Sequence, residues 1–299
     1  MAHGAALATA AVGGADRSTV AGAAILGREE AVSLLLGSGG VGAYGAALST
    51  TVYIGNKEII LLLLRRGADI NVVGGLFGTA LALAASRGNT EIVLLLLDRG
   101  ADINAMGGIF GTALATAALA GQGEVVSLLL DRGADIDAVG GRYRTALATA
   151  AFIGYEEIVL MLLDRGADIN KLGGTYGTAL ATAATRENEE IILLLLDWGA
   201  DINAVGGTYG TALAAAALAG QGDMVSLLMD RGADTSTVGG TYGTALATAA
   251  GSGDQETMRL LLGWGADINL VASEYFFFFF LESIRLISLR LCGAPVPSP

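Results

Sequence analysis

The sequence has almost no histidine, cysteine or proline, and each shortage excludes a class of protein. The lone histidine, His3, stands near the N-terminus, so the rest of the chain has no Ser–His or Cys–His nucleophile pair. A single cysteine, Cys292, excludes an internal disulfide framework and fits a reducing compartment. All three prolines fall within residues 295–299, so none interrupts a helix elsewhere.

Basic residues are also few. The 17 Lys and Arg residues against 29 Asp and Glu residues give a net charge of −12, which disfavours binding to nucleic acid or to an anionic membrane surface. The N-terminus carries no basic region before a Leu-rich segment, so we expect no secretory signal. We therefore expect a cytoplasmic protein, with a nuclear location left open.

A repeat of constant length organises most of the chain. The stretch from Thr112 to Arg144 recurs with its first residue at Thr79, Thr145, Thr178, Thr211 and Thr244, and with alanine in that place at Ala46. A fixed period of this length predicts a stack of repeats, each of which contacts its neighbours and shares their core.

Each repeat divides into two helices and a loop. Thr112 is positioned to cap a first helix over Leu114 to Ala120, and a second helix is expected to begin near Gln122. Every second helix carries an acidic residue in its first turn, where it meets the positive end of the helix dipole. Gly133 and its equivalents suit the left-handed residue that ends a helix. The connector that follows is either a turn or a short strand pair.

Two motifs carry a family resemblance. Gly-Ala-Asp-Ile-Asn-Ala after a Leu-rich helix, and Thr-x-Leu-x-x-Ala-Ala after the loop, resemble ankyrin repeats. The variant Gly-Gly-x-Tyr-Gly-Thr-Ala-Leu is similar to arrays of fungal multidomain proteins, often downstream of nucleotide-binding modules. The resemblance implies an all-α helix–loop–helix–hairpin solenoid of about eight repeats that binds proteins on its concave face.

The chain departs from the family pattern at two places. Thr-Pro-Leu-His of the family is Thr-Ala-Leu-Ala here, which removes a proline that pre-sets the first helical turn and a histidine that joins neighbouring repeats. Gly107 or an equivalent stands where the family usually has aspartate at the loop tip. We expect the array to depend more on apolar packing as a result.

The first and last recognisable repeats predict the domain boundaries. Residues 1–17 are interpreted as an irregular N-terminal cap or truncated repeat, 18–272 as the array, and 273–299 as a tail outside the repeats. Charged residues interrupt the tail and leave no uncharged run long enough to span a membrane. The tail is either an amphipathic capping helix or an aberrant gene-model end.

Two patterns invite a chemical interpretation. Repeated aspartates such as Asp102 suggest a calcium-binding ladder, but a spacing of one repeat is too wide to share an ion, and capping of each local turn is the better interpretation. Aromatic residues also recur at one position, and either pack beneath each loop or form a binding stripe on the concave face. These aromatic residues are Tyr44, Phe77, Phe110, Tyr143, Tyr176, Tyr209 and Tyr242.

Positions that vary between repeats are the candidates for partner binding. They lie just before the break between the two helices and at the loop tips, where packing of the core does not determine the residue type. Aromatic and arginine side chains dominate binding hot spots, which favours Tyr53, Phe152 and Arg142. The candidate set is Tyr53, Ile54, Arg87, Ile109, Leu119, Arg142, Phe152, Ile153, Arg186 and Leu218.

The sequence therefore predicts a non-catalytic scaffold that binds protein partners and needs no cofactor or metal. Its acidic charge favours a basic partner, although charge sets encounter rates more than identity. One alternative is the sensor portion of a larger nucleotide-binding receptor-like protein. Another is an enzyme with an unrecognised site, which the shortage of His, Cys and metal-ligand clusters disfavours.

Overall fold

The computed structural model describes residues 41–74, 78–141, 145–175 and 177–270. The chain divides into two compact units, an N-terminal unit of Met1–Ala146 and a C-terminal unit of Leu147–Pro299. The predicted cap over 1–17, the first part of the array over 18–40 and the tail over 273–299 lie outside the described residues.

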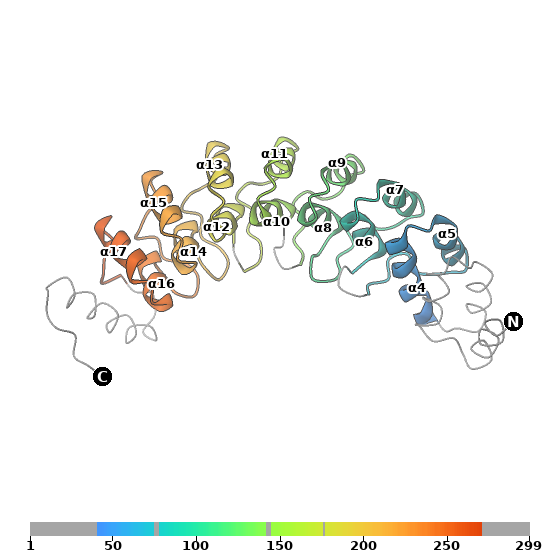
Figure 1. Ribbon diagram of the computed structural model, residues 1–299, viewed down its shortest axis with the longest axis horizontal. Helices are drawn as coiled ribbons and strands as arrows, with labels where there is room; N and C mark the ends of the chain where they lie inside the picture. Colours follow the sequence, from blue (N-terminus) through green and yellow to red (C-terminus); the bar gives the residue numbers. More distant parts are fainter. Residues whose placement is uncertain (1–40, 75–77, 142–144, 176, 271–299) are drawn as a thin grey trace. The chain divides into compact units, whose positions relative to one another are not determined.

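The described residues form fourteen helices and no strand. The helices are arranged as seven pairs, each with a first and a second helix (Figure 1). The all-α repeat architecture predicted from the sequence is confirmed. The pairs in the N-terminal unit are α4 (Val41–Ile54) with α5 (Lys57–Arg65), α6 (Ala80–Ser86) with α7 (Thr90–Asp98), and α8 (Ala113–Leu119) with α9 (Gly123–Asp131). The later pairs are α10 (Ala146–Ile153) with α11 (Glu156–Asp164), α12 (Ala179–Ala184) with α13 (Glu189–Asp197), α14 (Ala212–Leu218) with α15 (Gly222–Asp230), and α16 (Ala245–Ser252) with α17 (Gln255–Gly263).

The first helices form the buried core of each unit. Apart from α4, they consist mainly of Ala, Leu and Thr, and small side chains let helix backbones approach closely. Helix α6 packs against α4 and α8, and α14 packs against α12 and α16. Thr112 caps α8 as predicted, because its hydroxyl oxygen accepts a hydrogen bond from the Ala115 N–H at 3.2 Å. The helix begins at Ala113, one residue earlier than predicted.

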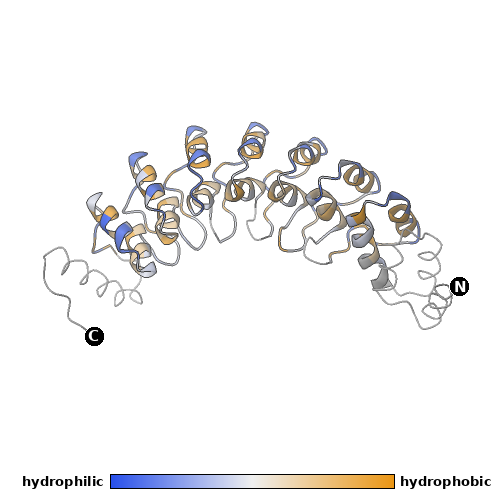
Figure 2. Ribbon diagram, in the orientation of Figure 1, coloured by the Kyte–Doolittle hydropathy of each residue, from blue (hydrophilic) through white to orange (hydrophobic). Residues whose placement is uncertain are grey.

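The second helices are amphipathic, and a left-handed glycine lies two residues after the last helical residue of each. In α9 the side chains of Val125, Val126 and Leu129 are buried against the first helices, while Glu124 in the first turn is exposed. Gly133 follows with φ +84°, the left-handed conformation that the sequence predicts there. In Figure 2, hydrophilic residues gather on α11, α13 and α15 and on the turns beside them.

Asp and Asn residues hold the loops together within and between repeats. The Asp102 carboxylate accepts a hydrogen bond from the Asn104 N–H at 2.9 Å, and the Asn104 side-chain oxygen accepts one from the next repeat's Asp135 N–H at 2.8 Å. The same turn forms at all seven repeated aspartates, which confirms that each caps its own turn. These hydrogen bonds explain the recurrence of the Asp-x-Asn motif in the loops.

Close stacking of the loops explains the glycines at their tips. A Cβ on Gly107 would meet the Val73 side chain at 2.8 Å, and one on Gly206 would collide with Leu172. An aspartate at these positions would require the neighbouring side chain to shift, which favours glycine there. The loops close with single bridges such as Gly107 to Gly111, so the turn interpretation is correct and the strand-pair alternative is wrong for the described loops.

Within the described residues, no helix has the length and apolar content needed to cross a membrane.

Candidate functional site

The C-terminal ends of the first helices place variable residues at the surface. In α8 every residue from Ala113 to Ala118 is buried, and Leu119 is the first that reaches solvent. Packing therefore fixes the buried part of the helix and leaves its end free to differ between repeats. These exposed ends supply eight of the ten predicted partner-binding residues, the others being Ile109 and Arg142.

The predicted residues of the N-terminal unit are largely exposed. Tyr53 is 54% exposed and Ile54 45%, Arg87 is exposed, and Leu119 is half-buried. Ile109 at a loop tip is 46% exposed. The sixth candidate of this unit, Arg142, lies outside the described residues.

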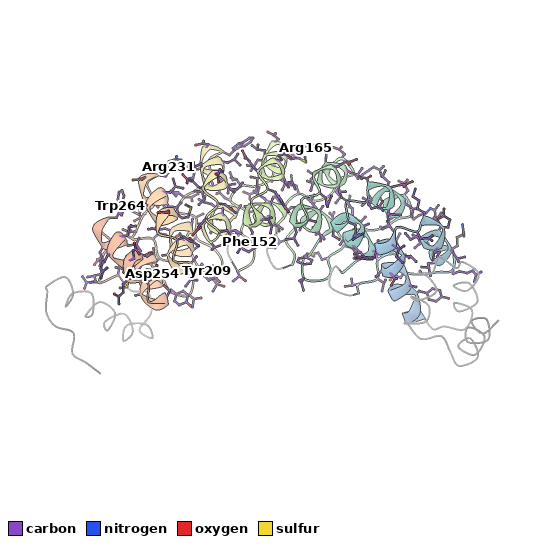
Figure 3. All side chains as sticks on the ribbon, in the orientation of Figure 1. Phe152, Arg165, Tyr209, Arg231, Asp254 and Trp264 are labelled. Atoms are coloured by element: carbon purple, nitrogen blue, oxygen red, sulfur yellow. The ribbon has the colours of Figure 1, made fainter. Side chains whose placement is uncertain are left out.

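The predicted residues of the C-terminal unit are more enclosed. Ile153 is 36% exposed and Arg186 is exposed, whereas Phe152 and Leu218 are half-buried. Figure 3 shows Phe152 and Tyr209 on the side of the first helices and loops, and Arg165 and Arg231 on the side of the second helices. The candidate surface of this unit is therefore separate from its row of second-helix ends.

The structure joins four candidates into two pairs that the sequence did not predict. The guanidinium carbon of Arg87 lies 4.3 Å from the ring centroid of Tyr53, and that of Arg186 lies 4.3 Å from the ring centroid of Phe152. We call these the ring–arginine pairs. Each stacks a planar cation on an aromatic face, an attraction worth about 0.5–1 kcal/mol at exposed sites.

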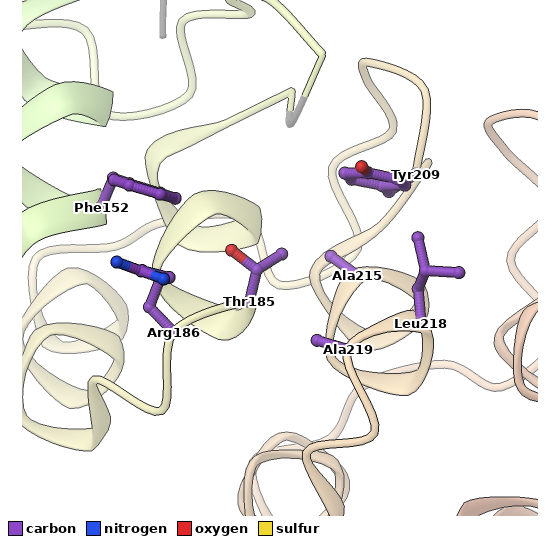
Figure 4. Close-up of a pocket in the computed structure, with 7 residues that line it drawn as sticks. All are labelled: Phe152, Thr185, Arg186, Tyr209, Ala215, Leu218 and Ala219. Carbon is purple, nitrogen blue, oxygen red and sulfur yellow. The ribbon is translucent and has the colours of Figure 1, made fainter. Parts of the chain in front are cut away.

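The C-terminal pair borders an open cavity of about 290 Å³. Phe152 and Arg186 lie face to face at one end, and Tyr209, Ala215 and Leu218 lie at the other (Figure 4). The remaining lining residues are Thr185 and Ala219. The cavity thus joins an apolar compartment to one guanidinium group.

The aromatic residues that recur at one position of the repeat are half-buried wherever the structure describes them. Tyr44, Phe110, Tyr209 and Tyr242 are half-buried, whereas Phe77, Tyr143 and Tyr176 lie outside the described residues. Tyr209 lines the cavity, so one member contributes to the candidate surface while its ring is still partly packed. Packing of this ring is therefore partial, and a role for it in recognition stays a prediction.

Backbone pairing occupies the loop tips of the C-terminal unit. The Thr208 N–H donates to the Thr175 carbonyl at 2.6 Å, and the Thr241 N–H donates to the Thr208 carbonyl at 2.7 Å. These threonines therefore have a structural role beside any contact with a partner. Two large exposed residues, Trp198 at 45% and Trp264 at 46%, lie at second-helix ends and were not among the candidates.

One carboxyl group in the loops has a shifted pKa. The Ser236 hydroxyl and then its backbone N–H donate to the Asp234 carboxylate and hold its pKa below the ordinary value of 3.8. The shift comes from local turn chemistry. In the part of the chain that the structure describes, no three His, Cys, Asp or Glu side chains gather to hold a metal ion.

A signal that would have found the ring–arginine pairs lies in the sequence at three times the repeat length. Tyr53-Ile54, Ser86-Arg87 and Leu119-Ala120 occupy successive helix ends, and Phe152-Ile153, Thr185-Arg186 and Leu218-Ala219 follow in the same order three repeats later. An aromatic residue is therefore followed each time by an arginine in the next repeat. Reading the repeats one at a time conceals this longer period.

Comparison with known proteins agrees with the architecture. No curated protein matches the chain. The family described as Ankyrin repeats (3 copies) matches at residues 48–140, 81–173, 114–206 and 204–272, which together cover most of the chain. With its helix pairs, its left-handed glycines and this match, the chain belongs to the ankyrin repeat family.

Proposed function

We propose that this protein is a non-catalytic scaffold that binds a partner protein through the exposed ends of its first helices and the adjoining loop tips. Ankyrin repeats generally mediate protein–protein interaction. The observation that carries the proposal is the ring–arginine pairs, which stand at positions that differ between repeats while the core of the same helices stays constant. Aromatic and arginine side chains are the usual anchors of protein interfaces.

Charge and location complete the proposal. The net charge of −12 favours a basic partner, because opposite charges speed the encounter of two proteins. Such an encounter would take place in the cytoplasm. The family is typically non-catalytic, and the exposed arginines and rings support binding without suggesting a reaction.

Affinity capture from the native lysate tests this proposal. Wild-type protein is expected to retain a partner, and replacement of Tyr53, Arg142 and Phe152 by alanine is expected to abolish its capture while helicity measured by circular dichroism stays intact. Replacement of Trp198 and Trp264 by alanine is the matched control, because it removes exposed aromatic area from the second-helix ends. Capture that survives the triple change contradicts the surface assignment.

The Gly-Gly-x-Tyr-Gly-Thr-Ala-Leu variant favours a second candidate, the sensor portion of a receptor-like protein of the fungal type. A sensor of that kind is expected to bind poorly until it is joined to a nucleotide-binding switch domain. Capture by the isolated chain at full strength contradicts this candidate and supports the scaffold.

A further inference from the structure

The two ring–arginine pairs belong to two copies of one larger arrangement. The cavity residues Phe152, Arg186 and Leu218 each lie three repeats after Tyr53, Arg87 and Leu119. The other lining residues Thr185, Tyr209, Ala215 and Ala219 correspond in the same way to Ser86, Phe110, Thr116 and Ala120. Each set lies wholly within one unit.

The two copies agree in structure as well as in sequence. The guanidinium-to-ring distance is 4.3 Å in both, Arg87 and Arg186 are both exposed, and Leu119 and Leu218 are both half-buried. Among the described residues, neither arginine forms an ion pair with a carboxylate. Both copies therefore present an exposed, ring-backed cation, and in the C-terminal copy an apolar cavity lies beside it.

The chemistry of this arrangement indicates its ligand. Stacking uses the face of the guanidinium group and leaves N–H donors in its plane, which match the two oxygens of a carboxylate. The half-buried leucine and aromatic ring beside it, Leu218 and Tyr209 in the C-terminal copy, offer apolar area for a branched aliphatic side chain. A ligand that satisfies both parts needs a carboxylate and an aliphatic side chain close together.

Charge around the arginines limits how acidic that ligand is. Arg186 is followed closely by Glu187, Glu189 and Glu190, all of them exposed, so a segment with several carboxylates would be repelled at the C-terminal copy. At the N-terminal copy Gly88 stands in place of Glu187, and Glu91 is paired with Lys57. A single carboxylate in a neutral or basic segment fits both copies, and the N-terminal copy is expected to bind it more tightly.

We propose that each unit carries one copy of a peptide-binding site, Tyr53–Arg87–Leu119 and Phe152–Arg186–Leu218, and that each copy binds a partner segment in which one acidic residue adjoins a large aliphatic residue. This proposal rests on the scaffold function and adds the chemistry and number of the segments it binds. A partner with two such segments gains overall affinity only if its linker lets both reach their sites together.

A selection from displayed random heptapeptides tests the proposal on the full chain. Peptides with an acidic residue next to Leu, Ile or Val are expected to be enriched on the wild type and lost on Arg87→Gln/Arg186→Gln. The matched control is Arg132→Gln/Arg231→Gln, which removes the same charge at two exposed second-helix ends that are also three repeats apart. Equal enrichment on the double variant of the ring–arginine pairs contradicts the proposal.

Titration calorimetry with the most enriched synthetic peptide then counts the sites. Two peptides are expected to bind each wild-type chain and one to bind either single arginine variant. Replacing the peptide's acidic residue by its amide is expected to weaken binding at least about tenfold, because a hydrogen bond to a charged group is lost. One site in the wild type, or no effect of the amide, overturns the proposal.

The same proteins separate this proposal from the scaffold function. If native-partner capture depends on Tyr53 and Phe152 but is unchanged by Arg87→Gln/Arg186→Gln, the ligand chemistry is wrong and the scaffold function stands. If the peptides bind as expected but the wild type captures no partner, the site stands and the scaffold function is contradicted.

Discussion

The N-terminal and C-terminal units carry the same ring–arginine pair in different surroundings. Tyr53 is 54% exposed, whereas Phe152 is half-buried at the edge of a cavity. After the arginine, the N-terminal unit has Gly88 at φ +67°, and the C-terminal unit has Glu187 at φ +57°, the one positive-φ residue other than glycine in the described part of the chain. The loops of the two units are alike. Residues that agree between the units are therefore those that the stack of repeats requires, and residues that differ are those that the surface leaves free to vary.

Replacing a loop glycine that both units share is expected to destabilise the fold more than any other change considered below. Gly78→Ala would place a Cβ against the Gly107 backbone of the next loop. Gly177→Ala would place one 2.6 Å from the Gly206 carbonyl oxygen. Both glycines have φ near +85°. We expect each change to lower the free energy of unfolding by about 2–4 kcal/mol, because strain of the left-handed backbone adds to the collision. Urea denaturation followed by circular dichroism measures the loss.

Two other glycines provide the control for this test. Gly67 and Gly166 have the same positive φ, but nothing lies within 4 Å of an added Cβ. Their replacement by alanine is expected to cost only about 1–2 kcal/mol. Losses of equal size at all four positions would show that loop stacking adds nothing beyond backbone strain.

The next effect separates the two rings. Phe152→Ala is expected to lower the free energy of unfolding by about 1–2 kcal/mol, and Tyr53→Ala by less than about 1 kcal/mol, because the half-buried ring removes more apolar area from water. Thermal denaturation of both variants beside the wild type checks the order. A larger loss at Tyr53 would contradict the burial of the two rings described here.

A smaller effect concerns the residue after each arginine. Glu187→Gly is expected to raise the free energy of unfolding by about 0.5–1 kcal/mol, since glycine adopts the left-handed backbone without strain. The reverse change, Gly88→Glu, is expected to destabilise, because φ is +67° at this position and the Gln122 side chain would also have to move away from the new Cβ. Paired denaturation curves measure both, and a stabilising Gly88→Glu would refute the assignment of strain.

The smallest effect is a pH dependence that comes from Asp234 in the C-terminal unit. Because the Ser236 hydrogen bonds lower the pKa of Asp234 in the folded chain, this carboxylate stabilises the fold above its unfolded pKa, and the contribution is lost as the pH falls through the folded pKa, below 3.8. Carboxyl NMR titration is expected to give a midpoint below 3.8, shifted upward in Ser236→Ala. An unchanged midpoint would mean that the Ser236 hydroxyl has no influence.

The sequence predicts the fold well because the same capping and turn residues recur across the seven helix pairs. The Thr112 cap, the acidic first turn of α9 and the left-handed Gly133 follow from backbone chemistry close by in the chain, and the structure confirms all three. The start of α8 at Ala113 follows from the cap itself, because the residue directly after the Thr112 N-cap is the first helical one.

The candidate site was predicted only as a set of positions. Contact between Tyr53 and Arg87 depends on side-chain directions across neighbouring repeats, which a position-by-position comparison does not contain. The loop glycines posed the same difficulty, since the reason for Gly107 is the Val73 side chain of the preceding loop. Contacts between repeats are therefore what the sequence left unpredicted.

Hydrogen–deuterium exchange with and without the captured partner locates the partner-binding surface on the unmodified chain, without any substitution. We predict slower exchange at the ends of the first helices, in the segments around Arg87 and Arg186, with little change around Trp198 and Trp264. Protection concentrated at those two tryptophans, with the first-helix ends unchanged, would contradict the claim that the ring–arginine pairs form the partner-binding surface.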